Sequence, residues 1–384
     1  DKKREFRLRQ LTQFDKIWAA LSKLSRPRAA ATVLAVGAVV WAGAWWFGNR
    51  VMIGDAQQGV AELRPEARYN QDARLISSKF ALGVDTMNVI VEAGPSACTT
   101  SYAAMEMIDR FAWHMANIEG VEQVITLPMA AKQVNAGWND GSPRWKVLPR
   151  DPDTLRQSTQ SFEVDSGLLN ADCSAIPVTI FTADHKSTTI DRIVAATKQF
   201  RTENNAYEPG FAKKRDAAAA KAMESGEEYT TDQVNFRLAT GPLGVQAATN
   251  DTVREKEHLI LYLLYGAVFA MCWISFRSWR AALCVTLPLM LVTELGHSLM
   301  VLLGIGMKVN TLTVVALGVG IGVDYGIYIF ARMREAMNQG KTLSESYFIS
   351  LKTTGIAIFY TALTLAVGVA MWIFSDLKFQ ADMG

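Results

Sequence analysis

Four residues in the C-terminal part of the chain could carry protons inside a membrane. Asp324 lies within residues 311–331, about twenty mostly apolar residues, enough to cross a bilayer as a helix. Inserting a charge at that depth costs on the order of 3 kcal/mol. We therefore expect this carboxylate to have a partner, a cavity or a function. Tyr325 follows it, and its hydroxyl could donate to an acid on a neighbouring helix or simply pack in the interior.

Glu294 and His297 lie near the middle of another apolar segment, residues 281–305. They are three residues apart and therefore share one helix face. Because histidine titrates near neutral pH, we predict that Asp324, Glu294 and His297 form one proton path between adjacent helices. The alternative is a Glu–His pair that neutralises itself. A Glu-x-x-His pair also occurs in di-metal bundles, but these need a second copy and further carboxylates, so we expect no metal.

Four glycines interrupt the segment around Asp324. Small residues let membrane helices approach closely, and we predict a packing role for all four: Gly318, Gly320, Gly322 and Gly326. A phosphate-binding loop would need a preceding strand and a soluble helix, which this apolar run excludes. A purely structural, hydrogen-bonded Asp324 is the competing interpretation of the acid.

The composition indicates a protein that is part membrane and part soluble. Of 384 residues, 50% are hydrophobic and 20% are charged, and the apolar residues are clustered. The net charge of +2 gives no support for nucleic-acid binding. The chain starts with Asp1 and shows no signal peptide, so we expect it to begin inside a longer protein or to be trimmed.

Five apolar segments are predicted to span the membrane: residues 29–49, and then a four-helix bundle within 258–375 made of 259–275, 281–305, 311–331 and 355–375. The basic residues 1–28 predict an amphipathic helix on the cytoplasmic surface, or else a linker helix packed on protein. A second cytoplasmic helix is expected at 332–352. The positive-inside tendency then places residues 50–257 in the periplasm. Residues 376–384 would be a periplasmic tail leading to a missing last helix.

The region 50–257 alternates strands and helices. Strands are predicted at 86–93, 121–127, 176–183 and 233–239, and helices at 100–118, 187–203 and 211–229. Two β-α-β units suggest a porter-like α+β domain built of ferredoxin-like modules. In an oxidising periplasm, Cys98 and Cys173 would form a disulfide; two unpaired residues are the alternative. We find no nucleophile–base arrangement and expect no enzyme activity.

These features together resemble the resistance-nodulation-division (RND) superfamily, especially its MmpL-like exporters (the MMPL family). The resemblance rests on the order of spans and soluble domain, and on three stretches: GVGIGVDYGIYIFARMREAMNQGKTLSES, GIAIFYTALTLAVG and FQADMG. It implies two repeats, of which this would be the C-terminal one without its last helix. It also implies that Asp324 and Tyr325 form the proton relay, whereas Glu294 and His297 are not part of the family pattern.

The resemblance further implies what the protein does and with what. It implies export of hydrophobic or amphiphilic molecules such as lipids from a bacterial inner membrane, driven by proton influx without another cofactor. Expected partners are membrane lipid, the other transmembrane repeat, a homo-oligomer and accessory proteins. One rival is a SecDF-type protein-translocation motor, but its central helix typically reads Asp-Ala-Asn, unlike Asp324-Tyr325-Gly326. The other, a sterol-sensing-like lipid receptor, has no need of a titratable Asp324.

Overall fold

The chain folds into two units, which we describe separately. A computed structural model describes residues 15–383 except 58, 61, 81–84, 163, 227–228 and 230. The first half of the helix predicted at 1–28 therefore lies outside the described residues. One unit, the membrane unit, combines Asp1–Ala56 with Thr252–Gly384, and the other, the soluble unit, is Gln57–Asp251.

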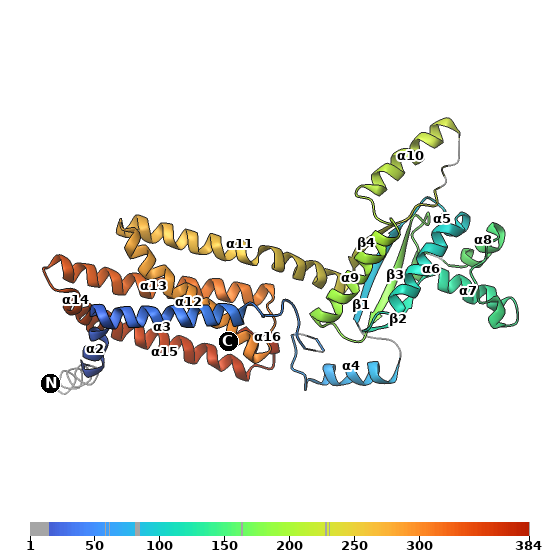
Figure 1. Cartoon of the computed structure of the whole chain (residues 1–384). Coiled ribbons are helices and arrows are strands. Elements are labelled where there is room, and N and C mark those ends of the chain that lie inside the picture. The colour runs from blue at the N-terminus through green and yellow to red at the C-terminus, as the bar shows by residue number, and fades with distance from the viewer. Residues whose placement is uncertain are drawn as a thin grey trace. The chain divides into compact units, whose positions relative to one another are not determined.

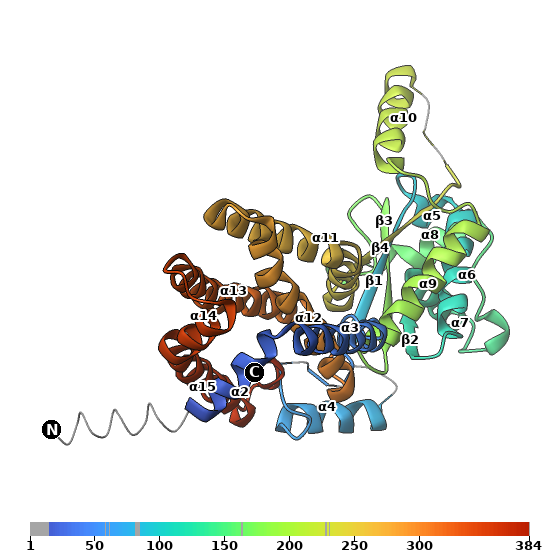
Figure 2. The same cartoon turned by 60° about the vertical axis from the view of Figure 1, so that its left-hand side comes forward.

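The membrane unit is a bundle of helices, seen from two sides in Figures 1 and 2. Five helical segments of the described chain are long and apolar enough to cross a membrane, and each coincides with one predicted span, which extends past it by at most two residues. Many large apolar side chains on them are exposed, as expected of surfaces that face lipid. The helices are α2 (Asp15–Ser22), α3 (Pro27–Gly48), α11 (Pro242–Phe276), α12 (Trp279–Leu303), α13 (Val309–Asn338), α14 (Leu343–Ser350), α15 (Ile356–Ala370) and α16 (Lys378–Met383).

The boundaries around the predicted cytoplasmic helix, residues 332–352, differ from the prediction. α13 continues past the predicted span to Asn338, because residues 332–338 contain no glycine or proline and Arg332 pairs with Glu335 one turn later. Gly340, with φ of +81°, then allows the chain to turn. Thr342 accepts a bond from the Glu345 amide and starts α14, which runs through a π-helical turn into α15. The predicted loop helix is thus divided between two membrane-length segments.

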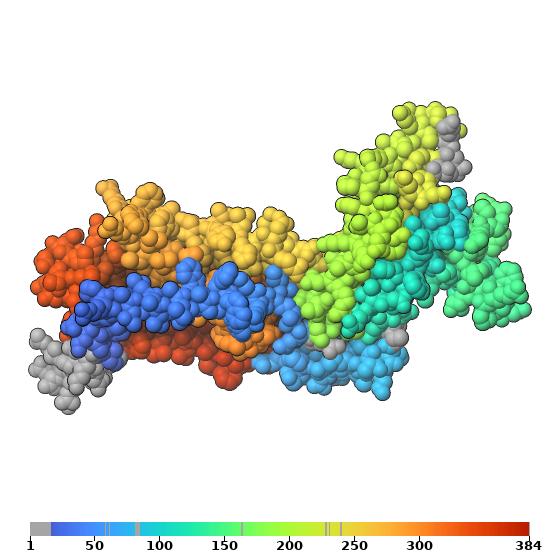
Figure 3. Space-filling view, in the orientation of Figure 1, coloured from blue at the N-terminus to red at the C-terminus, as the bar shows by residue number. Residues whose placement is uncertain are grey.

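Three helices share the apolar core of the membrane unit. Val285 of α12, Val319 of α13 and Cys272 of α11 are all buried in one cluster. α3 packs on another face of α12, where the Ser298 hydroxyl donates to the Ala44 carbonyl at 2.9 Å. Figure 3 shows α3 and α11 exposed on the same face of this unit.

A short backbone contact ties the segment after α3 to the turn before α13. The Gly54 amide donates to the Met307 carbonyl, and the Met307 amide donates to the Met52 carbonyl, both at 2.7 Å. Lys308 forms an ion pair with Asp55 beside them. We call residues 52–55 the strap. It holds the start of α13 against the chain that leaves α3.

The soluble unit is built on one four-stranded antiparallel sheet. Its strands are β1 (Asp85–Glu92), β2 (Val121–Ile125), β3 (Ala175–Thr182) and β4 (Asn235–Thr240), in the order β2-β3-β1-β4. β1 and β3 pair along their full lengths, from Asp85 opposite Thr182 to Glu92 opposite Ala175. The two predicted β-α-β units are therefore interleaved in a single sheet.

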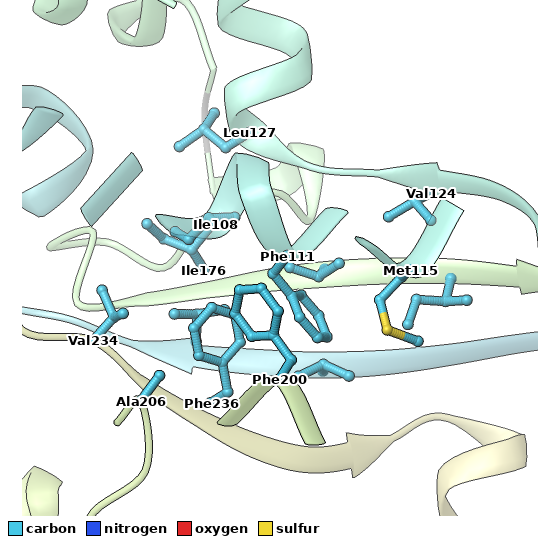
Figure 4. Close-up of a cluster of buried hydrophobic side chains, with 14 of the residues drawn as sticks. Ile108, Phe111, Met115, Val124, Leu127, Ile176, Phe200, Ala206, Val234 and Phe236 are labelled. Atoms are coloured by element: carbon cyan, nitrogen blue, oxygen red, sulfur yellow. The ribbon is translucent and has the colours of Figure 1, made fainter. Parts of the chain in front are cut away.

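Helices α6 (Tyr102–Ala116) and α9 (Ser187–Glu203) connect the strands and supply the core of this unit. The rings of Phe111, Phe200 and Phe236, from α6, α9 and β4, pack with centroids 4.7–5.6 Å apart. Figure 4 shows them against the sheet, between the apolar side chains of the strands. Alternate residues of β3, such as Ile176 and Ile180, point into this core.

Further helices lie between the strands of this sheet and before its first strand. Between β2 and β3 lie α7 (Leu127–Gly137) and α8 (Pro152–Gln160), and before β1 lies α4 (Arg68–Lys79). Cys98, in the short helix α5 (Ala97–Thr100), forms a disulfide with Cys173 next to β3, with Cα atoms 5.7 Å apart. α10 (Phe211–Ser225) extends away from the rest of the unit, in Figures 1 and 3, as predicted for the exposed stretch 211–229.

Candidate functional site

Asp324 lies at the midpoint of α13, on a face of that helix that no other described helix covers. Exposed residues recur every three or four positions along this face, and together they form what we call the exposed stripe: Thr313, Leu317, Gly320, Asp324 and Tyr328. Among the described residues, no hydrogen bond or ion pair involves the Asp324 carboxylate. Tyr325, about 100° further around the helix, is half-buried. The exposed stripe therefore contains one carboxylate with no described hydrogen bond or ion pair, in a helix long enough to span a membrane.

The opposite face of α13 packs on α12 through two of the four predicted glycines. A methyl group at Gly322 would lie 2.6 Å from Leu289, and one at Gly326 would lie 2.9 Å from Val285. They are four residues apart, the spacing of small-xxx-small packing. Gly318 and Gly320 have no described atom within 4 Å of the same position. Gly322 and Gly326 thus lie in the contact with α12, while Gly318 and Gly320 lie on the open side of the helix.

This packing predicts that Gly326→Ala destabilises the membrane unit. The added methyl group would lie 2.9 Å from Cγ1 of Val285, whose branched side chain has little freedom to move. We expect a loss of about 1–3 kcal/mol, as for other overpacked sites, measured by thermal unfolding of the purified protein in detergent. Gly318→Ala is the matched control on the same helix and should be neutral. Equal losses in both variants would contradict the assigned packing face.

Glu294 and His297 lie on α12, but they do not meet Asp324. Both line a cavity of about 210 Å³ bounded by α3, α11 and α12. The absent side chain of Gly48 on α3 makes room for them: its Cβ position is 3.1 Å from Cβ of His297 and 3.6 Å from Oε2 of Glu294. None of the described hydrogen bonds or ion pairs joins them to Asp324 or Tyr325. The four residues predicted as one proton path therefore form two separate groups.

The cavity also contains residues that the sequence alone did not single out. Glu257 and His258 of α11 line it, together with Arg254. Tyr265 closes one side, and its hydroxyl donates to the hydroxyl of Thr293 on α12. Glu257 and His258 directly precede the predicted second span. Their place next to a membrane segment could have marked them as candidates, but the sequence analysis assigned them to the region before the helix. Their helix in fact begins fifteen residues earlier, at Pro242.

One buried polar atom in this cavity lacks a described partner. His297 is only 5% exposed, and its Nε2 atom has no hydrogen-bond partner among the described residues. Glu257 is 7% exposed. The described residues include no group of three or more His, Cys, Asp or Glu side chains arranged to hold a metal ion. The cavity is thus a place where ionisable groups meet without neutralising one another through direct bonds.

Comparison with known proteins places the chain in a family. The model of the MMPL family matches residues 64–384. The chain is 23% identical over 147 residues to "Putative membrane protein MJ1562" of Methanocaldococcus jannaschii, a match covering 38% of each chain. It is 39% identical over 64 residues to "Probable trehalose monomycolate exporter MmpL3" of Mycobacterium leprae, covering 17% of this chain and 7% of that protein.

The matched segments are well under two thirds of the length of either relative. The family model, by contrast, spans most of this chain, including the soluble sheet and α11–α16. The chain is therefore a multi-pass membrane protein that belongs to the MMPL family, as an MmpL-like member of the RND superfamily.

Proposed function

We propose that this chain is one repeat, the C-terminal one, of a proton-driven exporter of hydrophobic or amphiphilic molecules such as lipids. The observation that carries the proposal is the bare carboxylate of Asp324 at the middle of an exposed helix face. Lipid cannot solvate such a charge. The exposed stripe is then the surface that meets the other transmembrane repeat, whose groups complete the site around Asp324 and Tyr325.

Protonation of Asp324 would change how the two repeats fit together. Binding a proton removes the charge and turns the carboxylate from an acceptor into a donor. One proton moving inward yields about 2.3 kcal/mol per 100 mV of membrane potential. That free energy can shift one repeat against the other, the motion common to transporters built from repeats. Tyr325, one position further on, would donate its hydroxyl to the acid of the other repeat.

The soluble unit would open and close the path of the exported molecule outside the membrane. We propose that it is a ferredoxin-like porter domain in the periplasm of a bacterial cell with its membrane unit in the inner membrane. The strand order β2-β3-β1-β4 with two crossing helices supports the first part. The Cys98–Cys173 disulfide supports the second, since disulfides persist in oxidising compartments. A homo-oligomer and accessory proteins belong to the same proposal.

The cargo class rests on the relatives. The Mycobacterium leprae protein is named for exporting trehalose monomycolate, a glycolipid. We therefore propose a lipid or lipid-like amphiphile as the cargo here, without carrying over that particular molecule. Neither rival considered in the sequence analysis has a specific feature in its favour. A translocation motor typically has Asp-Ala-Asn where this chain has Asp324-Tyr325-Gly326, and a sterol-sensing-like receptor leaves the position of Asp324 unexplained.

Reconstitution tests the proposal. The protein in liposomes, with a fluorescent phospholipid analogue in the membrane and an imposed pH gradient, should move the analogue between leaflets and take up protons at the same time. A protonophore should stop the lipid movement, because it removes the driving gradient. Lipid movement that continues unchanged without a gradient would contradict proton coupling. Proton uptake without lipid movement would contradict the cargo class while keeping the coupling ion.

A further inference from the structure

The cavity between α3, α11 and α12 points to a second site of proton binding, apart from Asp324. It lies where α3 ends and α11 passes α12, the end of the membrane unit at which the chain leaves for the soluble unit. Its lining is rich in ionisable and hydroxyl groups. No described contact connects it with the exposed stripe on α13.

The cavity is large enough to hold water. Its volume of about 210 Å³ far exceeds the roughly 10–15 Å³ that a single water needs. Water also needs two to four polar partners. Among the lining residues, those with polar side chains include Glu257, Glu294, His297, Thr293 and Tyr262. A hydrated cavity would satisfy the buried Nε2 atom of His297, which has no partner among the described residues.

Its lining combines basic and acidic side chains with histidines. From α11 come Arg254, Glu257 and His258, and from α12 come Glu294 and His297. The lining residues of α3 and the segment after it are Trp45, Gly48, Asn49, Val51 and Ile53, none of which titrates. Glu257 and His258 line the same space as Glu294. Two carboxylates that share one cavity favour uptake of a proton, because both cannot easily stay ionised.

We propose that this cavity is a second protonation site, in which Glu294 and His297 of α12 bind a proton delivered through water and share it with Glu257 of α11. The proton adds to a carboxylate oxygen of Glu294 or Glu257 or to the imidazole of His297, and it returns to water by the same route. No other bond forms or breaks. The role of this site in export, which is to set the pH at which the transporter runs, rests on the proposed function. The binding of a proton at this site does not depend on that function.

Histidine resonances give a direct test, because the chain has only four histidines. In protein labelled with ¹⁵N-histidine, in detergent, the His297 signal is assigned with His297→Gln. We expect it to change between about pH 5 and pH 8. Glu294→Gln should move its titration midpoint by roughly one pH unit, because the two side chains are one helical turn apart. His114, in the soluble unit, is the internal control, and its signal should not respond to Glu294→Gln.

Two further variants separate this proposal from the proposed function. Glu257→Gln reaches the cavity from α11 and should also move the His297 midpoint, which keeps the test available if Glu294→Gln does not fold. Asp324→Asn should leave the midpoint unchanged. In export assays, Glu294→Gln should shift the pH profile, whereas Asp324→Asn stops export at every pH. If the His297 signal does not titrate, or if its midpoint is the same in both glutamate variants as in the wild type, the proposed second site is wrong. That conclusion would hold whatever the effect of Asp324→Asn.

Discussion

Asp324→Asn is expected to abolish proton-coupled export while the protein still inserts and folds. Asparagine has nearly the same shape as aspartate but cannot take up or release a proton near neutral pH. The exposed position of Asp324 means that no described hydrogen bond or ion pair within this chain is lost. We expect proton uptake and lipid movement to fall to the level of empty liposomes, with thermal stability equal to or slightly above that of the wild type, because a charge is removed from a membrane-spanning helix.

Glu335→Gln provides a matched control for this experiment. Glu335 is an exposed carboxylate on the same helix, eleven residues later, and therefore on nearly the same face. It pairs with Arg332 outside the apolar run, so its loss costs little. Export should be unchanged in Glu335→Gln and should return in part in Asp324→Glu, which restores a titratable group. Normal export by Asp324→Asn would remove this acid from the mechanism and with it the proposed coupling.

Periodicity and length were enough to predict most elements of the fold. Five apolar runs of membrane length predicted five spans, and each coincides with one helical segment, past which it extends by at most two residues. In the soluble unit the apolar periodicity of 187–203 matches α9, Ser187–Glu203, to the residue. The alternation of residues 176–183 marks β3 within one residue. Such signals are local, because burial of one face leaves a repeat of 3.6 or 2 residues in the sequence.

Contacts between helices could not be predicted in the same way. The sequence shows four glycines around Asp324, but only the structure shows that Gly322 and Gly326 face α12 while Gly318 and Gly320 do not. Similarly, Glu294 and Asp324 both lie in the membrane, yet they occupy different faces of different helices. Depth along a helix is readable from a sequence, whereas rotation about its axis depends on which neighbour it packs against. The strand order of the sheet could not be predicted from the sequence either, because it too depends on which elements pack side by side.

The strap after α3 gives a second prediction with a large effect, Gly306→Ala. The added methyl carbon would lie 1.8 Å from the Gly54 carbonyl oxygen and 3.0 Å from its carbon, so two backbone segments would have to separate. Their separation breaks the two hydrogen bonds between Gly54, Met307 and Met52. It also exposes Met307, which is 1% exposed. We expect a loss of about 3 kcal/mol in the free energy of unfolding, measured by thermal unfolding of the purified protein.

Two variants show whether backbone contact is what matters in the strap. Lys308→Met removes the ion pair with Asp55 but leaves the backbone bonds, and we expect it to cost less than Gly306→Ala. Gly296→Ala, on α12 with no described atom within 4 Å of the new methyl group, should be neutral. If Gly306→Ala is as stable as Gly296→Ala, the strap does not hold α13. If it is destabilised as expected, the start of the helix that carries Asp324 is fixed to the segment leading to the soluble unit. Movement of α13 on protonation would then be transmitted along the chain at that point.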